Sequence, residues 1–330
     1  MIRRIGIGVA GVGVMGEIHI QAYLRNPLVR LVGVCDVDLQ RVRWIASKYE
    51  TTAYSTVEDL IAQAEVEAVS ICTSDQHHLA PTLCALDGGK HTLLEKPLAT
   101  TLADADQIID KDRNTSAKLM IGHIVRFDPR YARIKQMLDD GELGQLETIF
   151  ARRMNTVDAQ DVLKGRVSVL SFLGVHDFDY LRWLAGAEAS RVHTETVSKL
   201  LKSRGYDVED NTFTLIRFAN GVVGCVESGW ALPANLPRKA DFKLEAIGTK
   251  GVGYVDLVQQ GLAVCTADQG FQRPGLGHSI DAEIAHFIDC ILEHKQPLID
   301  ATDGRAALEI SLAAQRSARS GTIVQLPLSE

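Results

Sequence analysis

Two side chains of this 330-residue chain have the chemistry and the setting for acid–base work, Lys96 and His176. Lys96 lies in Glu95-Lys96-Pro97, directly after the apolar run His91–Leu94. If that run is a strand of a parallel sheet, ligands bind beyond its carboxyl end, where the lysine ammonium could stabilise negative charge that develops on a substrate oxygen. By its position alone, Lys96 fits a surface salt bridge with Glu95 equally well.

The second candidate, His176, lies in Leu173–Leu184, a segment with helical spacing of apolar residues. Imidazole titrates near neutral pH, so it suits proton exchange with an alcohol oxygen. On a helix, His176 and Asp179 are three positions apart and share a face. A lone histidine in such a segment is more often a core or capping residue, and Asp179 could instead pair with Arg182. The residues alone therefore leave both roles open.

A nucleotide-binding pattern lies near the N-terminus. The stretch Gly11–Gly16 reads G-x-G-x-x-G, follows the apolar run Ile5–Ala10 and begins a helical segment. Gly11 permits a tight turn, Gly13 lets the backbone approach a pyrophosphate, and Gly16 lets the helix pack on the strand. The N-terminus of the helix then faces the phosphates. The predicted cofactor contacts in this turn are Gly11, Gly13, Val14, Met15 and Gly16.

The choice of cofactor depends on Asp36, twenty residues after Gly16 at the end of the apolar run Leu28–Cys35. A carboxylate there accepts hydrogen bonds from the ribose hydroxyls and repels a 2′-phosphate, so we expect NAD. Arg41 could still hold a 2′-phosphate, which leaves NADP open as an alternative.

Short apolar runs alternate with helical patterns along the first 122 residues. The apolar runs are Ile5–Ala10, Leu28–Cys35, Ala68–Cys72, His91–Leu94 and Lys118–Ile121, and the helical patterns are Met15–Arg25, Gln40–Tyr49, Val57–Ala64, Leu79–Asp87 and Leu102–Arg113. Nearly continuous apolar strands separated by helices predict a parallel sheet covered on both faces. Right-handed crossovers make it doubly wound. We therefore expect a Rossmann dinucleotide-binding domain over residues 1–122.

The pattern changes after Asp128-Pro129. Longer alternating segments and an Asn220-Gly221 hairpin signal predict a mixed or antiparallel sheet with helices on one face. These segments are Leu146–Met154, Arg191–Val197, Thr212–Phe218, Val222–Trp230 and Phe242–Ile247. The fold class we expect is α/β, with the Rossmann domain followed by a C-terminal α+β domain that has a large, mostly antiparallel open sheet over residues 123–330.

Composition and residue spacing argue against nucleic-acid binding, a membrane span and a metal site. The formal net charge of −7 gives no basic footprint for nucleic acid. We see no uncharged stretch long enough to span a bilayer. Six cysteines without C-x-x-C spacing are typical of reduced core residues in a cytoplasmic protein. The chain has no H-x-x-x-H pattern and no cluster of cysteines and histidines, so we expect no metal.

The chain as a whole resembles the Gfo/Idh/MocA oxidoreductases, a family that includes glucose–fructose oxidoreductase and inositol 2-dehydrogenase. The resemblance covers essentially the whole chain, with the motifs in the family's order. It implies binding of NAD or NADP and hydride transfer to or from sugars, cyclitols and related hydroxy or keto compounds. The motifs that carry it are Gly11–Gly16 with His19, Thr73–His78, Glu95–Pro97, Gly122–Pro129 and Gly174–Asp179.

The resemblance also implies roles for residues. Lys96 matches the family's substrate-binding and catalytic lysine, and His176 matches its catalytic histidine. We expect Arg126, Asn155 and Asp179 to contact the substrate. The open sheet of the second domain commonly forms a dimer or tetramer interface, so we also expect a homo-oligomer. The positions that match the nicotinamide border are Thr73, Asp75, His78, Glu95 and Lys96.

One position departs from the family. Many of its dehydrogenases carry an aspartate four residues before the catalytic histidine, whereas this chain has Phe172. Either His176 acts without that partner, or Asp177 or Asp179 replaces it. Two other classes stay open: a glycoside-cleaving enzyme that uses NAD for transient oxidation, and a non-catalytic dinucleotide sensor. The sequence does not identify the substrate.

Overall fold

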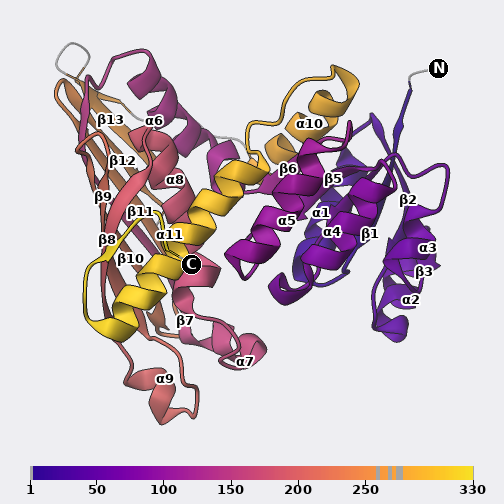
Figure 1. Ribbon diagram of the computed structural model, residues 1–330, viewed down its shortest axis with the longest axis horizontal. Helices are drawn as coiled ribbons and strands as arrows, with labels where there is room; N and C mark the ends of the chain where they lie inside the picture. Colours follow the sequence, from indigo (N-terminus) through magenta and orange to yellow (C-terminus); the bar gives the residue numbers. More distant parts are fainter. Residues whose placement is uncertain (1–2, 258–260, 267–269, 273–277, 330) are drawn as a thin grey trace. The chain divides into compact units, whose positions relative to one another are not determined.

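The computed structural model describes residues 3–257, 261–266, 270–272 and 278–329 (Figure 1). The chain divides into two units. The first unit is made of residues 1–127 and 278–305, and the second of residues 128–277 and 306–330.

A six-stranded parallel sheet with the order β3-β2-β1-β4-β5-β6 forms the centre of the first unit. This order confirms the predicted doubly wound Rossmann fold. The strand order switches at β1, because β2 and β3 lie on one side of it and β4, β5 and β6 on the other. The carboxyl ends of β1 and β4 therefore flank a crevice of the kind where ligands bind in such folds. The strands are β1 (Ile5–Ala10), β2 (Val29–Cys35), β3 (Thr52–Tyr54), β4 (Ala68–Ile71), β5 (His91–Glu95) and β6 (Leu119–Gly122).

Helices connect these strands. All six residues of β1 are buried, as expected for a strand covered on both faces. The short β3 was not predicted, because three residues of mixed polarity give no periodic signal. The helices are α1 (Val14–Arg25), α2 (Leu39–Lys48), α3 (Val57–Ile61), α4 (Leu79–Asp87) and α5 (Leu102–Arg113), with short 3₁₀ turns η1 (Asp75–His77) and η2 (Ile124–Phe127).

A helix from late in the chain, α10 (Ser279–Leu292), belongs to the first unit. Its buried side chains Ile284, Phe287 and Ile288 join the core formed by β1 and α1. The sequence predicted a single division at residue 122, with the second domain running to residue 330. The structure differs because apolar spacing shows that a helix has a face to bury but not which sheet buries it.

The second unit contains a nine-stranded sheet with the order β14-β13-β12-β11-β7-β10-β9-β8-β15. Most pairs are antiparallel, as predicted, but β7 and β10 run parallel. The strands are β7 (Leu146–Thr156), β8 (Ala189–Val197), β9 (Asn211–Phe218), β10 (Val223–Leu232), β11 (Ala240–Gly248), β12 (Gly251–Asp256), β13 (Gly261–Thr266), β14 (Gly270–Gln272) and β15 (Val324–Gln325).

The longer helices of the second unit, α6, α8 and α11, lie on one face of this sheet (Figure 1). Strand β9 shows the two faces, since Thr214 and Ile216 are buried whereas Phe213 and Leu215 are each about half exposed. The hydroxyl of Ser317 accepts a hydrogen bond from the amide of Thr194 in β8, which fixes α11 to the sheet. The helices are α6 (Pro129–Asp139), α7 (Gln160–Leu163), α8 (Val175–Ala185), α9 (Leu200–Ser203) and the part of α11 (Ala301–Ser320) after residue 305.

Two further observations bear on the predictions from composition. Among the described residues, no helix is long and apolar enough to span a bilayer. The cysteines whose side chains are described are all free thiols: Cys35, Cys72, Cys84, Cys225 and Cys290.

Replacement of Phe287 by alanine tests whether α10 belongs to the core of the first unit. The ring is fully buried among residues of β1 and α1. Phe287→Ala should therefore destabilise the unit by about 3–5 kcal/mol, seen as a lower urea midpoint. Leu24→Ala, at a half-exposed position of α1, should leave the midpoint near that of the wild type. Equal midpoints for both variants would contradict this packing.

Candidate active site

The three glycines of the first turn each meet a different constraint. Gly11 has φ of +85°, and a Cβ there would lie 2.6 Å from the backbone nitrogen of Thr73. A Cβ on Gly16 would lie 1.9 Å from the carbonyl oxygen of Gly11. A Cβ on Gly13 would meet no atom within 4 Å. Packing within the protein therefore requires Gly11 and Gly16, whereas Gly13 borders open space that a ligand can enter.

The N-terminus of α1 lies at this open space. Gly13 is its N-cap, and no side chain caps the helix, so its first backbone amides keep donors for an anion. Val14, the first helical residue, is 72% exposed. Met15 packs against the core of the unit. The turn has the geometry and the donors that a pyrophosphate requires, so it fits a dinucleotide cofactor.

A cavity of about 240 Å³ adjoins the turn. Asp36 lies in its wall, where Oδ2 accepts a hydrogen bond from the Val12 amide at 2.8 Å and Oδ1 accepts one from the Asp38 amide at 3.0 Å. The Arg41 Nε donates to the Val12 carbonyl at 2.7 Å, so that nitrogen is used within the turn. The cavity is lined by Gly11, Gly13, Cys35, Asp36, Val37, Ser55, Thr56, Val57, Cys72, Thr73, Ser74 and His77.

Part of this wall was not predicted from the sequence. Ser55 and Thr56 follow β3, and Val37 follows Asp36 with its side chain 96% exposed. Because β3 is too short to recognise, the loop after it gave no signal. A valine next to the carboxylate predicted to bind ribose is the one cue that sequence reasoning could have used, since an adenine ring needs an apolar surface.

Lys96 lies directly after β5, as predicted. Its backbone amide donates to Oε2 of Glu95 at 3.1 Å, and Oε1 of Glu95 lies 3.0 Å from Nε2 of His19. Glu95 is only 6% exposed. Burial alone would raise the pKa of Glu95, but the hydrogen bond to His19 and the charges of His19 and Lys96 lower it. Glu95 therefore supports the backbone of Lys96 rather than facing solvent.

His78 supports the same region from within the unit. Its Nδ1 lies 2.7 Å from the Pro97 carbonyl and its Nε2 lies 3.1 Å from the Thr73 carbonyl. Burial lowers the pKa of His78, while the hydrogen bonds to the two carbonyl groups and the charge of Glu95 act in the opposite direction. His78 thus holds the loop after β4 against the loop after β5. Asp75 begins the short turn η1 between them.

Arg126, expected to contact substrate, is 2% exposed in η2. Its Nη1 lies 3.2 Å from Oδ2 of Asp303 near the start of α11. The substrate contact expected of Arg126 stays a prediction.

In the second unit, His176 is the second residue of α8 and is half-buried. The helix continues directly from a π-helical turn, Leu170–Gly174. That turn carries Phe172, whose ring centroid lies 5.6 Å from that of Trp230. The position where the family resemblance predicts an acid therefore makes an aromatic contact in this protein.

An ion pair fixes the start of α8 to the sheet. Arg153 of β7 donates to both carboxylate oxygens of Asp177, at 2.7 and 3.0 Å, and both side chains are buried. Asp177 is thus held by Arg153 and is poorly placed to replace the missing acid beside His176. Asn155, two residues along β7, shares the face of Arg153 because side chains alternate along a strand. Asp179 is fully buried.

Among the described residues, one group of side chains has the spacing to hold a metal ion. Ligand atoms of His19, Glu95 and Glu283 lie within 4.8 Å of one another, and all three residues are buried. Sequence reasoning did not find this group, because Glu283 lies far along the chain in α10. His19 and Glu95 already bond each other.

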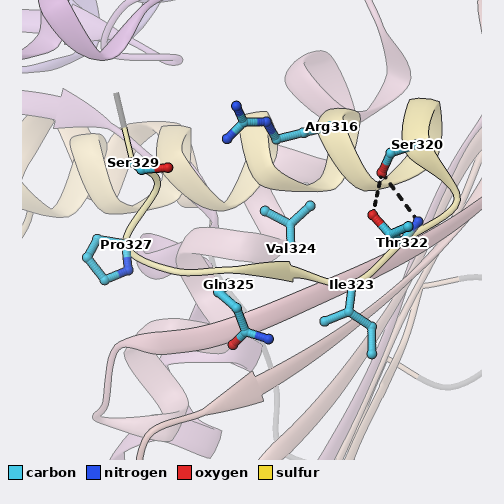
Figure 2. A pocket seen from close by; sticks show the side chains of 8 residues that line it. All are labelled: Arg316, Ser320, Thr322, Ile323, Val324, Gln325, Pro327 and Ser329. Carbon is cyan, nitrogen blue, oxygen red and sulfur yellow. Dashed lines mark hydrogen bonds between the residues drawn. The ribbon is translucent and has the colours of Figure 1, made fainter.

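A second cavity, of about 360 Å³, lies where α11 ends and β15 begins (Figure 2). Figure 2 shows the hydroxyl of Ser320 bonded to Thr322 at the turn between them. Arg316 is its one charged lining residue, and none of the predicted site residues borders it. This cavity has no groups for the predicted chemistry.

Comparisons with known proteins agree with this geometry. The family description "Oxidoreductase family, NAD-binding Rossmann fold" matches residues 5–123, and "GFO/IDH/MocA C-terminal domain" matches residues 131–253. The chain therefore belongs to the Gfo/Idh/MocA oxidoreductase family, as the sequence motifs suggested, and its cofactor is NAD.

Similar proteins cover nearly the whole chain. A myo-inositol 2-dehydrogenase of Thermotoga maritima is 27% identical over 97% of this chain and 98% of its own. A scyllo-inositol 2-dehydrogenase (NAD(+)) of Bacillus subtilis is also 27% identical, over 99% of this chain and 97% of its own. The crystal structure of GenD2 from gentamicin A biosynthesis, in complex with NAD, has a TM-score of 0.85 at 25% identity and covers 99% of this chain and 98% of its own.

Replacement of Asp36 tests cofactor choice. Asp36→Ala should raise the KM for NAD about tenfold or more, because hydrogen bonds to a charged group contribute about 1.5–3 kcal/mol. The KM for NADP should fall, since the charge that repels a 2′-phosphate is gone. Steady-state kinetics with each cofactor measures both changes.

Asp38→Ala is the matched control. Asp38 caps α2 by accepting from the amides of Gln40 and Arg41, and it does not line the cavity. Its loss should cost about 1 kcal/mol of stability and leave the KM for NAD near that of the wild type. If Asp36→Ala raised the KM for NAD and the KM for NADP equally, the proposed basis of cofactor choice would be refuted.

Proposed function

We propose that the protein catalyses the reversible NAD-dependent oxidation of a ring hydroxyl of a cyclitol or related polyol to a ketone. The observation that carries the proposal is the position of Lys96. It follows β5 at the edge of the sheet where the glycine turn and Thr73 border the cofactor cavity. The inositol dehydrogenases that align over nearly the whole chain support this substrate class.

The cofactor would be held by the glycine turn, the first amides of α1 and the carboxylate of Asp36. When bound, NAD supplies the carbon that accepts or donates a hydride. The ammonium of Lys96 is assigned to the oxygen of the reacting carbon, where it donates a hydrogen bond. As that oxygen loses its proton it gains negative charge, so the interaction with Lys96 strengthens toward the transition state.

His176 is assigned the exchange of the hydroxyl proton. An imidazole can accept this proton in oxidation and return it in reduction near neutral pH. Phe172 supplies no carboxylate, and Asp177 is bonded to Arg153. We therefore assign the proton exchange to His176 without an aspartate relay through either position. Asn155, on the helix-covered face of β7, is the proposed substrate contact of the second unit.

Two other activities of this fold predict different products. A glycoside-cleaving enzyme with transient oxidation would release a sugar without net NADH. A sensor would bind NAD and turn over no substrate. Net formation of NADH with an inositol is the result that separates the proposed dehydrogenase from both.

We also propose that the uncovered face of the nine-stranded sheet joins copies of this chain into a homodimer or homotetramer. A row of paired residues crosses this face, and Leu215 and Tyr254 in it are 49% and 37% exposed. The next row is charged, with Arg152 bonded to Glu227 and Lys243 paired with Asp256. Apolar area beside self-complementary charges suits an isologous interface. The first row is His193, Leu215, Cys225, Phe150, Glu245 and Tyr254.

Replacement of Lys96 tests the catalytic assignment. Lys96→Met should lower kcat with myo-inositol or scyllo-inositol by about 10²–10³, the usual loss when one donor to a developing oxyanion is removed. The affinity for NAD, measured by calorimetry, should change little. Reduced cofactor is followed by its absorbance.

Lys295→Met serves as the control, because this lysine pairs with Glu293 on the surface of the same unit. Its turnover should equal that of the wild type. The His176→Ala and double variants complete a cycle: if Lys96 and His176 act in one step, their effects should be far from additive. Turnover that survives Lys96→Met would rule out the assigned role.

A charge on the open face tests the interface. Leu215→Glu should shift the protein to smaller species in sedimentation, because a buried unpaired carboxylate opposes association. Leu24→Glu, at a half-exposed position of the first unit, should sediment like the wild type. An unchanged assembly of Leu215→Glu would contradict the proposed face.

A further inference from the structure

The helix that carries His176 begins at an irregular turn. The π-helical turn Leu170–Gly174 continues directly into α8. A π-turn closes its hydrogen bonds over one residue more than an α-turn, and such turns occur as single bulges inside α-helices. One residue corresponds to about 100° of rotation about the helix axis. If the bulge were lost, the side chains of α8 would rotate by that angle relative to the residues before it. The direction of His176 therefore requires a fixed point in α8.

Asp177 supplies this fixed point. Its side chain is fully buried, one residue after His176 in the first turn of α8. Oδ2 of Asp177 accepts a hydrogen bond from Nε of Arg153 at 2.7 Å, and Oδ1 accepts one from Nη2 at 3.0 Å. Two parallel hydrogen bonds between planar groups fix orientation as well as distance. A rotation of α8 about its axis would therefore break this pair of bonds.

The guanidinium of Arg153 is itself held by the sheet. In β7, Arg153 lies between Ser228 of β10 and Phe242 of β11, its partners in the strand pairing. The ring centroid of Phe242 lies 4.5 Å from the central carbon of the guanidinium, a distance at which a cation and an aromatic face attract each other. Arg153 is only 5% exposed. The ion pair thus connects the start of α8 to a central strand of the sheet.

A buried ion pair of this kind adds little net stability. Removal of both charges from water costs free energy that their mutual attraction roughly offsets, so well-packed apolar replacements are often neutral or stabilising. Two parallel hydrogen bonds, by contrast, have a direction that an apolar contact does not reproduce. The pair of Arg153 and Asp177 therefore contributes more to the position of the first turn of α8 than to the free energy of unfolding.

We infer that Arg153 is a positioning residue for His176: through its ion pair with Asp177 it fixes the rotation of the first turn of α8, and so the direction in which the imidazole points. The inference rests on the proposed function, in which His176 exchanges the hydroxyl proton of the substrate. The rival is an ion pair that only stabilises the second unit.

A crystal structure of an apolar double variant tests the position without any substrate. Arg153→Met/Asp177→Val keeps a similar total side-chain volume and leaves no unpaired charge, so its urea midpoint should be near that of the wild type. The imidazole of His176 should nevertheless be displaced by about 1 Å or more. An imidazole within about 0.5 Å of its wild-type position would overturn the inference.

Kinetics then separates position from stability. The double variant should lower kcat with myo-inositol or scyllo-inositol by about 10², the loss that a misplacement of about 1 Å can cause, with little change in the KM for NAD. If the pair only stabilised the unit, kcat would recover together with the urea midpoint, and this result would overturn the inference. The control Arg133→Met/Glu142→Leu removes another doubly bonded pair of the same unit and should keep the kcat of the wild type.

The conservative variant Arg153→Lys keeps the inference testable if the double variant does not fold. Lysine retains the positive charge beside Asp177 but cannot form two parallel bonds, so the variant should stay folded and lower kcat about tenfold. A kcat equal to that of the wild type would overturn the inference. If wild-type protein turned over no polyol, the proposed function would fail, while the position of His176 in a crystal structure of Arg153→Lys would still decide whether Arg153 fixes it.

Discussion

The burial of one negative charge constrains the whole first unit. An ionised carboxylate out of water must be fully hydrogen-bonded, and Glu95 meets this need with His19 on one oxygen and the Lys96 amide on the other. His19 belongs to α1, the helix whose N-terminus borders the glycine turn. A single helix therefore has uncapped amides beside the glycine turn and an imidazole that supports the carboxylate bonded to the Lys96 amide. If the turn holds the cofactor as proposed, one helix serves both the cofactor and the lysine.

In the second unit, a buried negative charge is neutralised by a buried positive charge. Arg153 and Asp177 are buried together and bond twice, which ties the first turn of α8 to β7. His176 is next to this pair in sequence, so its backbone is fixed by the pair. The ring of Phe172 packs on Trp230 at the position where the family resemblance predicts an acid. The surroundings of His176 are more apolar there than the resemblance predicts.

The sequence predicted those features that a local constraint specifies. Gly11 needs a left-handed backbone and Gly16 a close approach to a carbonyl, and both needs follow from residues near in sequence. The position of Lys96 followed from an apolar strand before it. The partner of Arg126 and the place of α10 could not be predicted, because each depends on a contact between distant segments. Burial of Asp177 was also hidden, since a charged residue next to a histidine is usually read as exposed.

The central strand pair of the nine-stranded sheet has a further consequence. Strands β7 and β10 run parallel, so the chain must return to the same end of the sheet through a long crossover, residues 157–222. That crossover contains α8 and His176. Pairing of β7 with β10 brings together residues separated by this whole crossover. The conformational entropy lost in forming the pair is therefore larger, and its formation slower, than for a hairpin. The crossover that contains His176 is thus also the segment whose length slows formation of the sheet.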